Sequence, residues 1–289
     1  MFFPNTFVDS LADYESARYV IFGVPFDNTS SYRAGSRWAP DAMRQASANF
    51  ESYNPTFDID LADLLIHDAG NLDTSASVDE TLQDLYEDTK DLLSDGKLPI
   101  MLGGEHSLSF ATVKACAESA GDDFGVLVLD AHFDLRDEYR GFKHNHACVS
   151  RNILSEVSKN LVSIGIRSGP EDEWVFAKEN KLKYYTADDV EAIGMVEVLK
   201  EALEWLDCSR LYLSLDMDVL DPAYAPGLGT PEPFGLSARD VRTAVRTLAP
   251  FSMAFDIVEI APEYDSGQTA MLGTKLMREF IAAHAASHR

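Results

Sequence analysis

Basic residues are scarce in this chain. Its 289 residues include 48 acidic side chains but only 24 lysines and arginines, which gives a formal net charge of -24 at pH 7. A surface with this charge repels phosphate backbones and anionic membranes, so nucleic acid and membranes are not expected as partners. It attracts metal ions and small cationic molecules, although most of the charge is expected to be a solvated layer that keeps the protein soluble.

Cysteines and long apolar runs are few as well. Cys116, Cys148 and Cys208 contain no Cys-x-x-Cys motif, so reduced thiols are expected rather than a disulfide framework or a zinc knuckle. No apolar run approaches the roughly 18 residues of a membrane span. The opening Met1-Phe2-Phe3-Pro4-Asn5 lacks the basic start and long apolar stretch of a signal peptide. We therefore predict a cytoplasmic protein.

Hydrophobic residues make up 46% of the chain, which is ample for a core. Short apolar runs that are typical of strands alternate with amphipathic stretches that are typical of helices. The expected strands are residues 19–24, 98–102, 124–129, 161–166, 211–215 and 253–260. The expected helices are residues 39–48, 78–93, 108–119, 147–159, 196–206, 238–248 and 269–286. This alternation predicts a single domain over residues 1–289 with an α/β fold of three layers, in which helices cover both faces of a central, mainly parallel sheet.

Acidic residues and histidines gather where two of these strands end. Asp130-Ala131-His132-Phe133-Asp134 follows strand 124–129, and Asp216-Met217-Asp218 follows strand 211–215. Residues two apart on a strand share a face, so the ionisable side chains of each segment are expected to converge. Ligands bind outside the carboxyl ends of parallel strands. Because so many buried ionisable groups are costly without a compensating cation, the two segments predict a metal site.

A third segment, Gly103-Gly104-Glu105-His106, follows strand 98–102 and is expected to bring His106 into the same crevice. Four carboxylates and two imidazoles exceed what one tetrahedral zinc needs, and they favour hard or borderline cations such as Mn²⁺. Two divalent ions are therefore expected. Paired ions about 3.5 to 4 Å apart lower the pKa of a bridging water, so the expected chemistry is hydrolysis. The candidate ligands are His106, Asp130, His132, Asp134, Asp216 and Asp218.

The chain resembles the ureohydrolases, a family that includes arginases and agmatinases and uses two manganese ions to release urea from guanidino compounds. The resemblance covers nearly the whole chain and implies an arginase-like fold. The matching segments, in chain order, are Gly23-Val24-Pro25-Phe26-Asp27-Asn28-Thr29, Gly103-Gly104-Glu105-His106-Ser107, Asp130-Ala131-His132-Phe133-Asp134, Ser214-Leu215-Asp216-Met217-Asp218-Val219-Leu220-Asp221-Pro222 and Asp256-Ile257-Val258-Glu259-Ile260-Ala261-Pro262.

The resemblance implies a ligand set for each manganese ion and a nucleophile, a hydroxide between the ions that attacks the guanidinium carbon. Asp130 and Asp216 would bridge the two ions. One ion would be held by His106, Asp130, Asp134 and Asp216, and the other by His132, Asp130, Asp216 and Asp218.

The resemblance also implies catalytic roles. Asp134 would handle the proton that passes to the leaving amine, and Glu259 would hold the guanidinium by charge-assisted hydrogen bonds. His146 resembles the family's proton-shuttling histidine, and an ordinary histidine pKa of about 6.5 suits that task. His144 is the alternative for this role.

Two departures from the arginase pattern bear on the substrate. Arginases usually have an asparagine two residues after the third metal-binding aspartate, and two acids after the Leu-Arg of a later strand. Here Arg136 replaces the asparagine, and Ser168 and Pro170 replace the acids. The chain therefore looks closest to agmatinases, which cleave the cationic substrate agmatine to putrescine and urea. Arginine, formiminoglutamate and guanidinobutyrate, whose carboxylate Arg136 could hold, are the alternatives.

Two other classes of protein remain open from the sequence. Deacetylases of related fold hold a single zinc with an Asp-x-His motif and a later aspartate, but they also carry an adjacent His-His pair, which this chain lacks. A non-enzymatic polyamine or metal sensor built on a hydrolase scaffold is the other alternative. The ureohydrolase resemblance further implies a homo-oligomer, a trimer or a hexamer.

Overall fold

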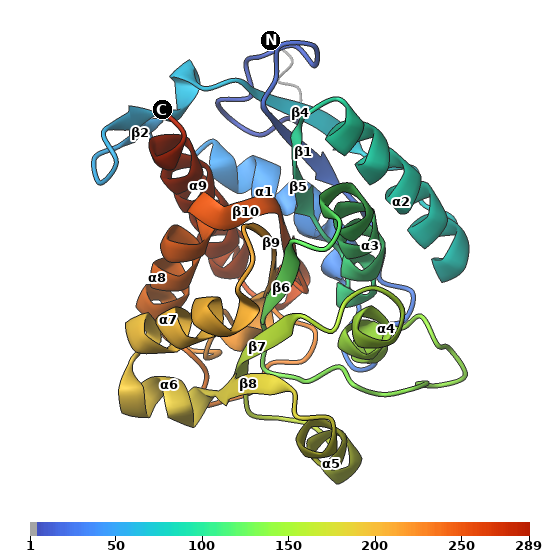
Figure 1. The fold of residues 1–289 in the computed structure, drawn as a ribbon. Helices are drawn as coiled ribbons and strands as arrows, with labels where there is room; N and C mark the ends of the chain where they lie inside the picture. Colours follow the sequence, from blue (N-terminus) through green and yellow to red (C-terminus); the bar gives the residue numbers. More distant parts are fainter. Residues whose placement is uncertain (1–4) are drawn as a thin grey trace.

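A computed structural model of the protein, which describes residues 5–289, has a central sheet between two layers of helices (Figure 1). The eight strands pair in the order β4-β1-β5-β10-β9-β6-β7-β8, and every pair is parallel. A separate antiparallel pair consists of β2 (Tyr53–Asn54) and β3 (Ile59–Asp60). The strands of the central sheet are β1 (Tyr19–Gly23), β4 (Ile66–Asn71), β5 (Leu98–Leu102), β6 (Phe124–Leu129), β7 (Leu161–Ile166), β8 (Lys183–Thr186), β9 (Arg210–Asp216) and β10 (Ser252–Val258).

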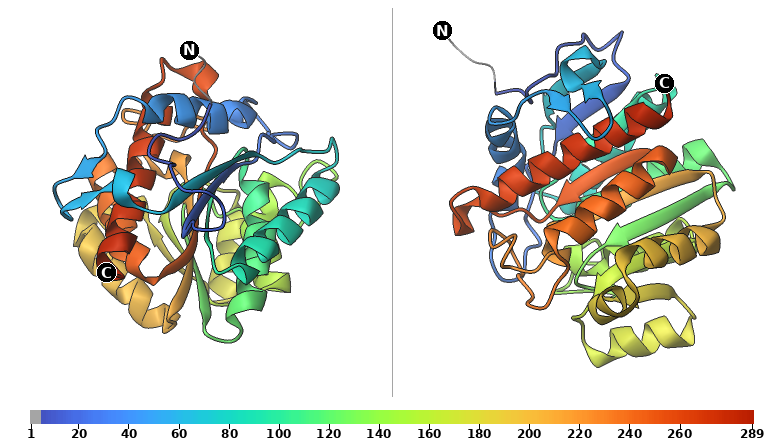
Figure 2. Two further views of the ribbon diagram at one scale, coloured as in Figure 1. Left: turned by 90° about the horizontal axis from the view of Figure 1, so that it is seen from above. Right: turned by 90° about the vertical axis from the view of Figure 1, so that its left-hand side faces the viewer.

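Helices cover both faces of this sheet, as Figure 2 shows from above. One layer contains α1 (Ala39–Ser47), α6 (Ala187–Ile193), α7 (Met195–Leu206), α8 (Ala238–Leu248) and α9 (Gln268–Ser287). The other contains α2 (Val78–Ser94), α3 (Ser109–Ala120), α4 (Val149–Glu156) and α5 (Glu171–Glu179). Each layer packs its own hydrophobic core against the sheet. The predicted three-layer α/β fold with a parallel sheet is therefore confirmed.

Burial on both faces explains why the central strands are continuous apolar runs. Every residue of β1, β5, β6 and β7 is buried. Local signals fix where helices begin. For example, α8 starts with a capping box in which Ser237 and Asp240 exchange hydrogen bonds.

No helix within residues 5–289 is long and apolar enough to cross a membrane. The prediction that no signal peptide is present was made on residues 1–5. Of these, residues 1–4 lie outside the described residues. A single domain over residues 1–289 stays a prediction.

Candidate metal centre

The carboxyl ends of β5, β10, β9 and β6, four neighbouring strands, meet at one edge of the sheet. A short 3-10 helix, His106–Leu108, follows β5, and another, Met217–Val219, follows β9. The turn after β5 depends on a glycine, because a Cβ atom at Gly104 would overlap the backbone of Phe26. This close approach lets the chain turn so that His106 faces the ends of the neighbouring strands.

Three carboxylates surround the buried imidazole of His106. Its Nδ1 lies 3.2 Å from a carboxylate oxygen of each of Asp130, Asp134 and Asp216. Neither His106 Nδ1 nor Asp130 Oδ2 has a hydrogen-bond partner in the described part of the chain, although both atoms are buried. Buried polar atoms are rarely left without a partner, so these two fit a bound cation. His106, Asp130 and Asp216 can hold one ion together, and we call them the first cluster.

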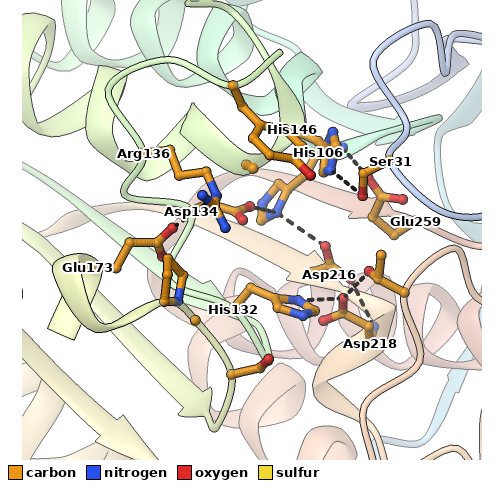
Figure 3. Close-up of a pocket in the computed structure, with 16 residues that line it drawn as sticks. Ser31, His106, His132, Asp134, Arg136, His146, Glu173, Asp216, Asp218 and Glu259 are labelled. Atoms are coloured by element: carbon orange, nitrogen blue, oxygen red, sulfur yellow. Dashed lines mark hydrogen bonds and ion pairs between the residues drawn. The ribbon is translucent and has the colours of Figure 1, made fainter.

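A second cluster consists of Asp130, His132 and Asp218. His132 Nδ1 lies 2.9 Å from Asp218 Oδ2 and 3.7 Å from Asp130 Oδ1. Figure 3 shows His106 and Asp216 of the first cluster and His132 and Asp218 of the second pointing toward one another. The structure thus brings all six predicted ligands together, and Asp130 belongs to both clusters. The predicted bridge through Asp216 stays a prediction, because Asp216 joins only the first cluster.

The pKa values of the buried histidine and aspartates show that positive charge would stabilise the site. Burial by itself would lower the pKa of the His106 imidazole, but the carboxylates of Asp130, Asp134 and Asp216 raise it well above its usual value. Burial and the neighbouring acids also raise the pKa of Asp216 well above its usual range, and burial and Asp130 raise the pKa of Asp134 to about 6. The carboxylates are therefore too crowded to ionise together unless cations compensate them.

A second layer of hydrogen bonds orients His106. Its Nε2 lies 3.1 Å from Ser214 Oγ, and Ser214 Oγ donates to the buried Asp256 carboxylate at 2.7 Å. Because the serine proton goes to Asp256, the serine oxygen accepts from Nε2–H, and the Nδ1 lone pair is left for a cation. Sequence reasoning assigned no role to Asp256, although an aspartate inside the apolar run 253–260 was a usable signal.

Asp134 and Glu259 both hold a left-handed backbone conformation, with φ of 53° and 65°. This conformation is costly for residues other than glycine and is often found at functional sites. The Glu259 side chain is fixed as well, because its Oε1 accepts a hydrogen bond from the backbone N–H of His106 at 2.7 Å. Its carboxylate is therefore held beside the first cluster.

The two histidines that were alternatives for the proton shuttle lie in different places. His146 lines a cavity of about 270 Å³ whose wall includes His106 and Asp216 of the first cluster and His132 and Asp218 of the second. Its Nε2 lies 3.3 Å from Ser31 Oγ. His144 lies in a separate groove, where its Nδ1 is 2.5 Å from Asp79 Oδ1 and its ring stacks on Phe110. Of these two histidines, only His146 lies in the cavity wall with the residues of the two His/Asp clusters.

An acidic residue that sequence reasoning missed lines the same cavity. Glu173, on α5, is buried, and burial and the nearby Asp134 raise its pKa to about 7. Its Oε1 lies 3.4 Å from Nε of Arg136, whose guanidinium lies over the Tyr139 ring at 4.7 Å. Arg136 is therefore already engaged by a carboxylate and an aromatic ring.

A parallel α/β sheet with paired His/Asp clusters at its carboxyl edge is the arrangement of a binuclear metal hydrolase. The model of the arginase family matches residues 17–283, and the chain belongs to that family. The ureohydrolase resemblance and the assignment as an enzyme are thereby confirmed.

Two relatives and one solved structure are similar over nearly their whole length. Agmatinase of Bacillus subtilis (strain 168) is 36% identical over 96% of this chain and 95% of its own. N(1)-aminopropylagmatine ureohydrolase of Thermococcus kodakarensis is 37% identical over 95% of this chain and 93% of its own. The crystal structure of agmatine ureohydrolase of Thermoplasma volcanium is 42% identical and has a TM-score of 0.95, covering 100% of this chain and 97% of that one.

Proposed function

We propose that this enzyme hydrolyses agmatine to putrescine and urea at a centre of two manganese ions. The observation that carries the proposal is a single cavity that is lined by residues of both His/Asp clusters and by Glu259 and Glu173. Glu259 and Glu173 lie on opposite sides of the clusters (Figure 3), so they match the guanidinium at one end of agmatine and the amine at the other. The two similar proteins named for agmatine support this choice.

The residues of the two clusters fit a pair of divalent ions. His106, Asp130, Asp134 and Asp216 would hold one ion, and Asp130, His132, Asp216 and Asp218 the other. A donor set of carboxylates and imidazoles favours hard or borderline ions, which supports manganese over thiolate-seeking metals. When bound, two such ions would supply the activation of water near neutral pH.

The remaining chemistry belongs to three side chains. Glu259, held by the His106 N–H, would accept hydrogen bonds from the guanidinium and orient its carbon. Asp134, whose carboxylate lies 3.2 Å from His106 Nδ1, would carry a proton to the leaving amine. His146, beside Ser31 at the cavity wall, would move protons between the cavity and solvent.

Arg136 and Glu173 favour a substrate with a cationic tail. An unpaired arginine side chain in the cavity wall would attract the carboxylate of the substrates arginine and guanidinobutyrate. The Arg136 side chain, however, is paired with Glu173 and lies over the Tyr139 ring. That ion pair uses Oε1 of Glu173, so the other carboxylate oxygen, Oε2, is the atom available to an amine. N(1)-aminopropylagmatine, a longer cationic compound, is the second candidate, because a relative named for it is 37% identical.

Urea release tests the proposal. Chelated protein would be reloaded with Mn²⁺ and given agmatine, N(1)-aminopropylagmatine, guanidinobutyrate and arginine, with ammonia and formamide measured for formiminoglutamate. We expect the highest kcat/KM on agmatine, no activity without added metal, and none from Asp134→Asn. Faster turnover of arginine than of agmatine would refute the substrate. One tightly held zinc in active protein would refute the two-ion centre and favour the deacetylase alternative, whereas binding without turnover would favour the sensor.

Assembly and location are part of the proposal. We expect a homo-oligomer, a trimer or a hexamer, in the cytoplasm. Sedimentation equilibrium would give the mass of the assembly, and a mass of 32 kDa, that of one chain, would contradict it.

A further inference from the structure

His146 is attached to Thr29 by two contacts. Its backbone N–H donates to Thr29 Oγ1 at 3.1 Å, and its ring Nδ1 lies 3.1 Å from the same oxygen. Thr29 lies 117 positions earlier in the chain and is buried. A single hydroxyl therefore faces both the backbone and the ring of His146.

The Thr29 hydroxyl is in turn held by the fully buried Glu105. Thr29 Oγ1 lies 2.5 Å from Glu105 Oε1, and the Thr29 backbone N–H donates to Oε2 at 2.7 Å. Ser107 Oγ also donates to Oε1, at 2.5 Å. Three donors thus converge on this carboxylate, which lies behind Thr29 as seen from His146.

With Glu105 as an ionised acceptor of three hydrogen bonds, counting protons fixes the direction of each hydrogen bond. A hydroxyl has one proton to donate and two lone pairs that accept. The Thr29 proton goes to the Glu105 carboxylate, and one lone pair accepts the His146 backbone N–H. The other lone pair faces Nδ1, so Nδ1 must carry a proton. In the neutral ring, Nε2 is then the unprotonated nitrogen, and it lies 3.3 Å from Ser31 Oγ at the cavity wall (Figure 3).

We propose that Glu105 and Thr29 are positioning residues that hold neutral His146 as the Nδ1–H tautomer, with Nε2 free to accept a proton from the cavity. The proposal rests on the proposed role of His146 as the proton shuttle. Burial lowers the pKa of His146 to about 4, so the ring is neutral near pH 7 and its tautomer decides which nitrogen accepts the proton. Without the Thr29 hydroxyl, both tautomers and other ring orientations become available.

A matched pair of variants tests this role. Thr29→Val removes the hydroxyl at nearly unchanged shape, and Thr29→Ser keeps it. We expect Thr29→Val to lower kcat for agmatine about tenfold, a modest part of a general acid–base contribution, with KM within about twofold and manganese content unchanged. Thr29→Ser should keep kcat within about twofold of the parent protein. Equal losses in both variants, or a normal kcat in Thr29→Val, would overturn the proposal.

The tautomer can be measured without substrate. Microcrystals of the [¹⁵N]histidine-labelled protein would be loaded with diamagnetic Cd²⁺, and His146 assigned by the signal missing from His146→Gln. Magic-angle-spinning NMR should show a protonated Nδ1 and an unprotonated Nε2 in the parent and in Thr29→Ser, and a mixture in Thr29→Val. A protonated Nε2 in the parent would overturn the proposal. If no guanidino compound is hydrolysed, the proposed function fails while the tautomer result still stands or falls separately.

Discussion

His106 Nδ1 and Asp130 Oδ2 lie 3.2 Å apart in the interior, and neither atom makes a hydrogen bond to any group in residues 5–289. A buried polar atom without a partner costs about 1 to 3 kcal/mol, so this pair is a poor choice for stability alone. A cation shared by the two atoms would satisfy both. The same pair would therefore link the free energy of unfolding to the binding of a cation.

Removing one imidazole should remove one ion. In His106→Asn we expect manganese to fall from two ions per chain to about one, because Asp130, His132 and Asp218 remain as a separate cluster. Mass spectrometry of the metal after gel filtration would measure the content. His144→Asn is the matched control, since His144 lies outside the cavity, and it should keep two ions. Two ions in His106→Asn would show that His106 is not a ligand.

Manganese should also stabilise the fold. An ion at 100 times its Kd adds about 2.7 kcal/mol to the free energy of unfolding. Two ions should then raise Tm by roughly 9 °C over chelated protein, which differential scanning calorimetry would detect. The double variant His106→Asn with Asp218→Asn should show almost no rise, because both clusters have lost a ligand. A similar rise in the double variant would place the ions elsewhere.

Glu173 should control the choice of substrate tail. Glu173→Gln is expected to raise KM for agmatine about tenfold, which corresponds to about 1.4 kcal/mol, with a small change in kcat. It should leave butylguanidine, which has no amine, unaffected. It should also raise kcat/KM for guanidinobutyrate, because Arg136 loses its carboxylate partner. Steady-state urea release with the three compounds measures all of this.

The control for Glu173 lies on the same helix. Glu171→Gln changes an exposed acid in the first turn of α5 and should leave all three compounds unchanged. Equal KM changes for agmatine and butylguanidine in Glu173→Gln would mean that Glu173 shapes the cavity and does not bind the tail.

Some parts of the fold could be predicted closely because burial acts on the sequence directly. Strands β5, β6 and β7 have the predicted bounds, since each is buried on both faces and reads as an unbroken apolar run. The edge strands β4 and β8 were missed, because β4 carries His67, Asp68 and Gly70 and β8 has only four residues. Edge strands need less apolar surface, so their signal is weak.

Among the helices, too, elements with a clear sequence pattern were predicted and elements with a weak pattern were missed. The bounds predicted for α8 agree with the structure, because the sequence of this helix has a clear amphipathic pattern. Two short helices, α5 and α6, were missed. Because α5 was missed, Glu173, which lies on this helix and lines the cavity, was not singled out from the sequence.

The candidate site divides in a similar way. The convergence of the six candidate ligands could be predicted because aspartates and histidines at strand ends are unusual and their chemistry is specific. The residues behind them could not, because their roles depend on contacts between distant segments. Thr29 and Glu105 lie 76 positions apart, and nothing near either residue in the sequence indicates that they meet.

A buried histidine away from the metal centre should make stability depend on pH. His284, on α9, is buried, with its Nδ1 2.9 Å from the Tyr19 hydroxyl. Burial, with smaller effects of His288 and Arg18, lowers its pKa to about 3. The ordinary histidine pKa is about 6.5, so between these two values the unfolded chain binds a proton that the folded protein does not. The stability from the neutral ring is therefore complete above about pH 6.5 and is lost as the pH falls below it.

His284→Phe should remove this dependence while keeping a ring that stacks on Phe280. From pH 6 to pH 4.5, the free energy of unfolding of the parent should fall more steeply than that of the variant, by at most about 1.4 kcal/mol per pH unit. Urea denaturation of both proteins in chelator gives the two slopes without a contribution from metal release. Parallel slopes would mean that His284 is protonated as easily in the folded protein as in the unfolded chain, and that burial does not keep it neutral.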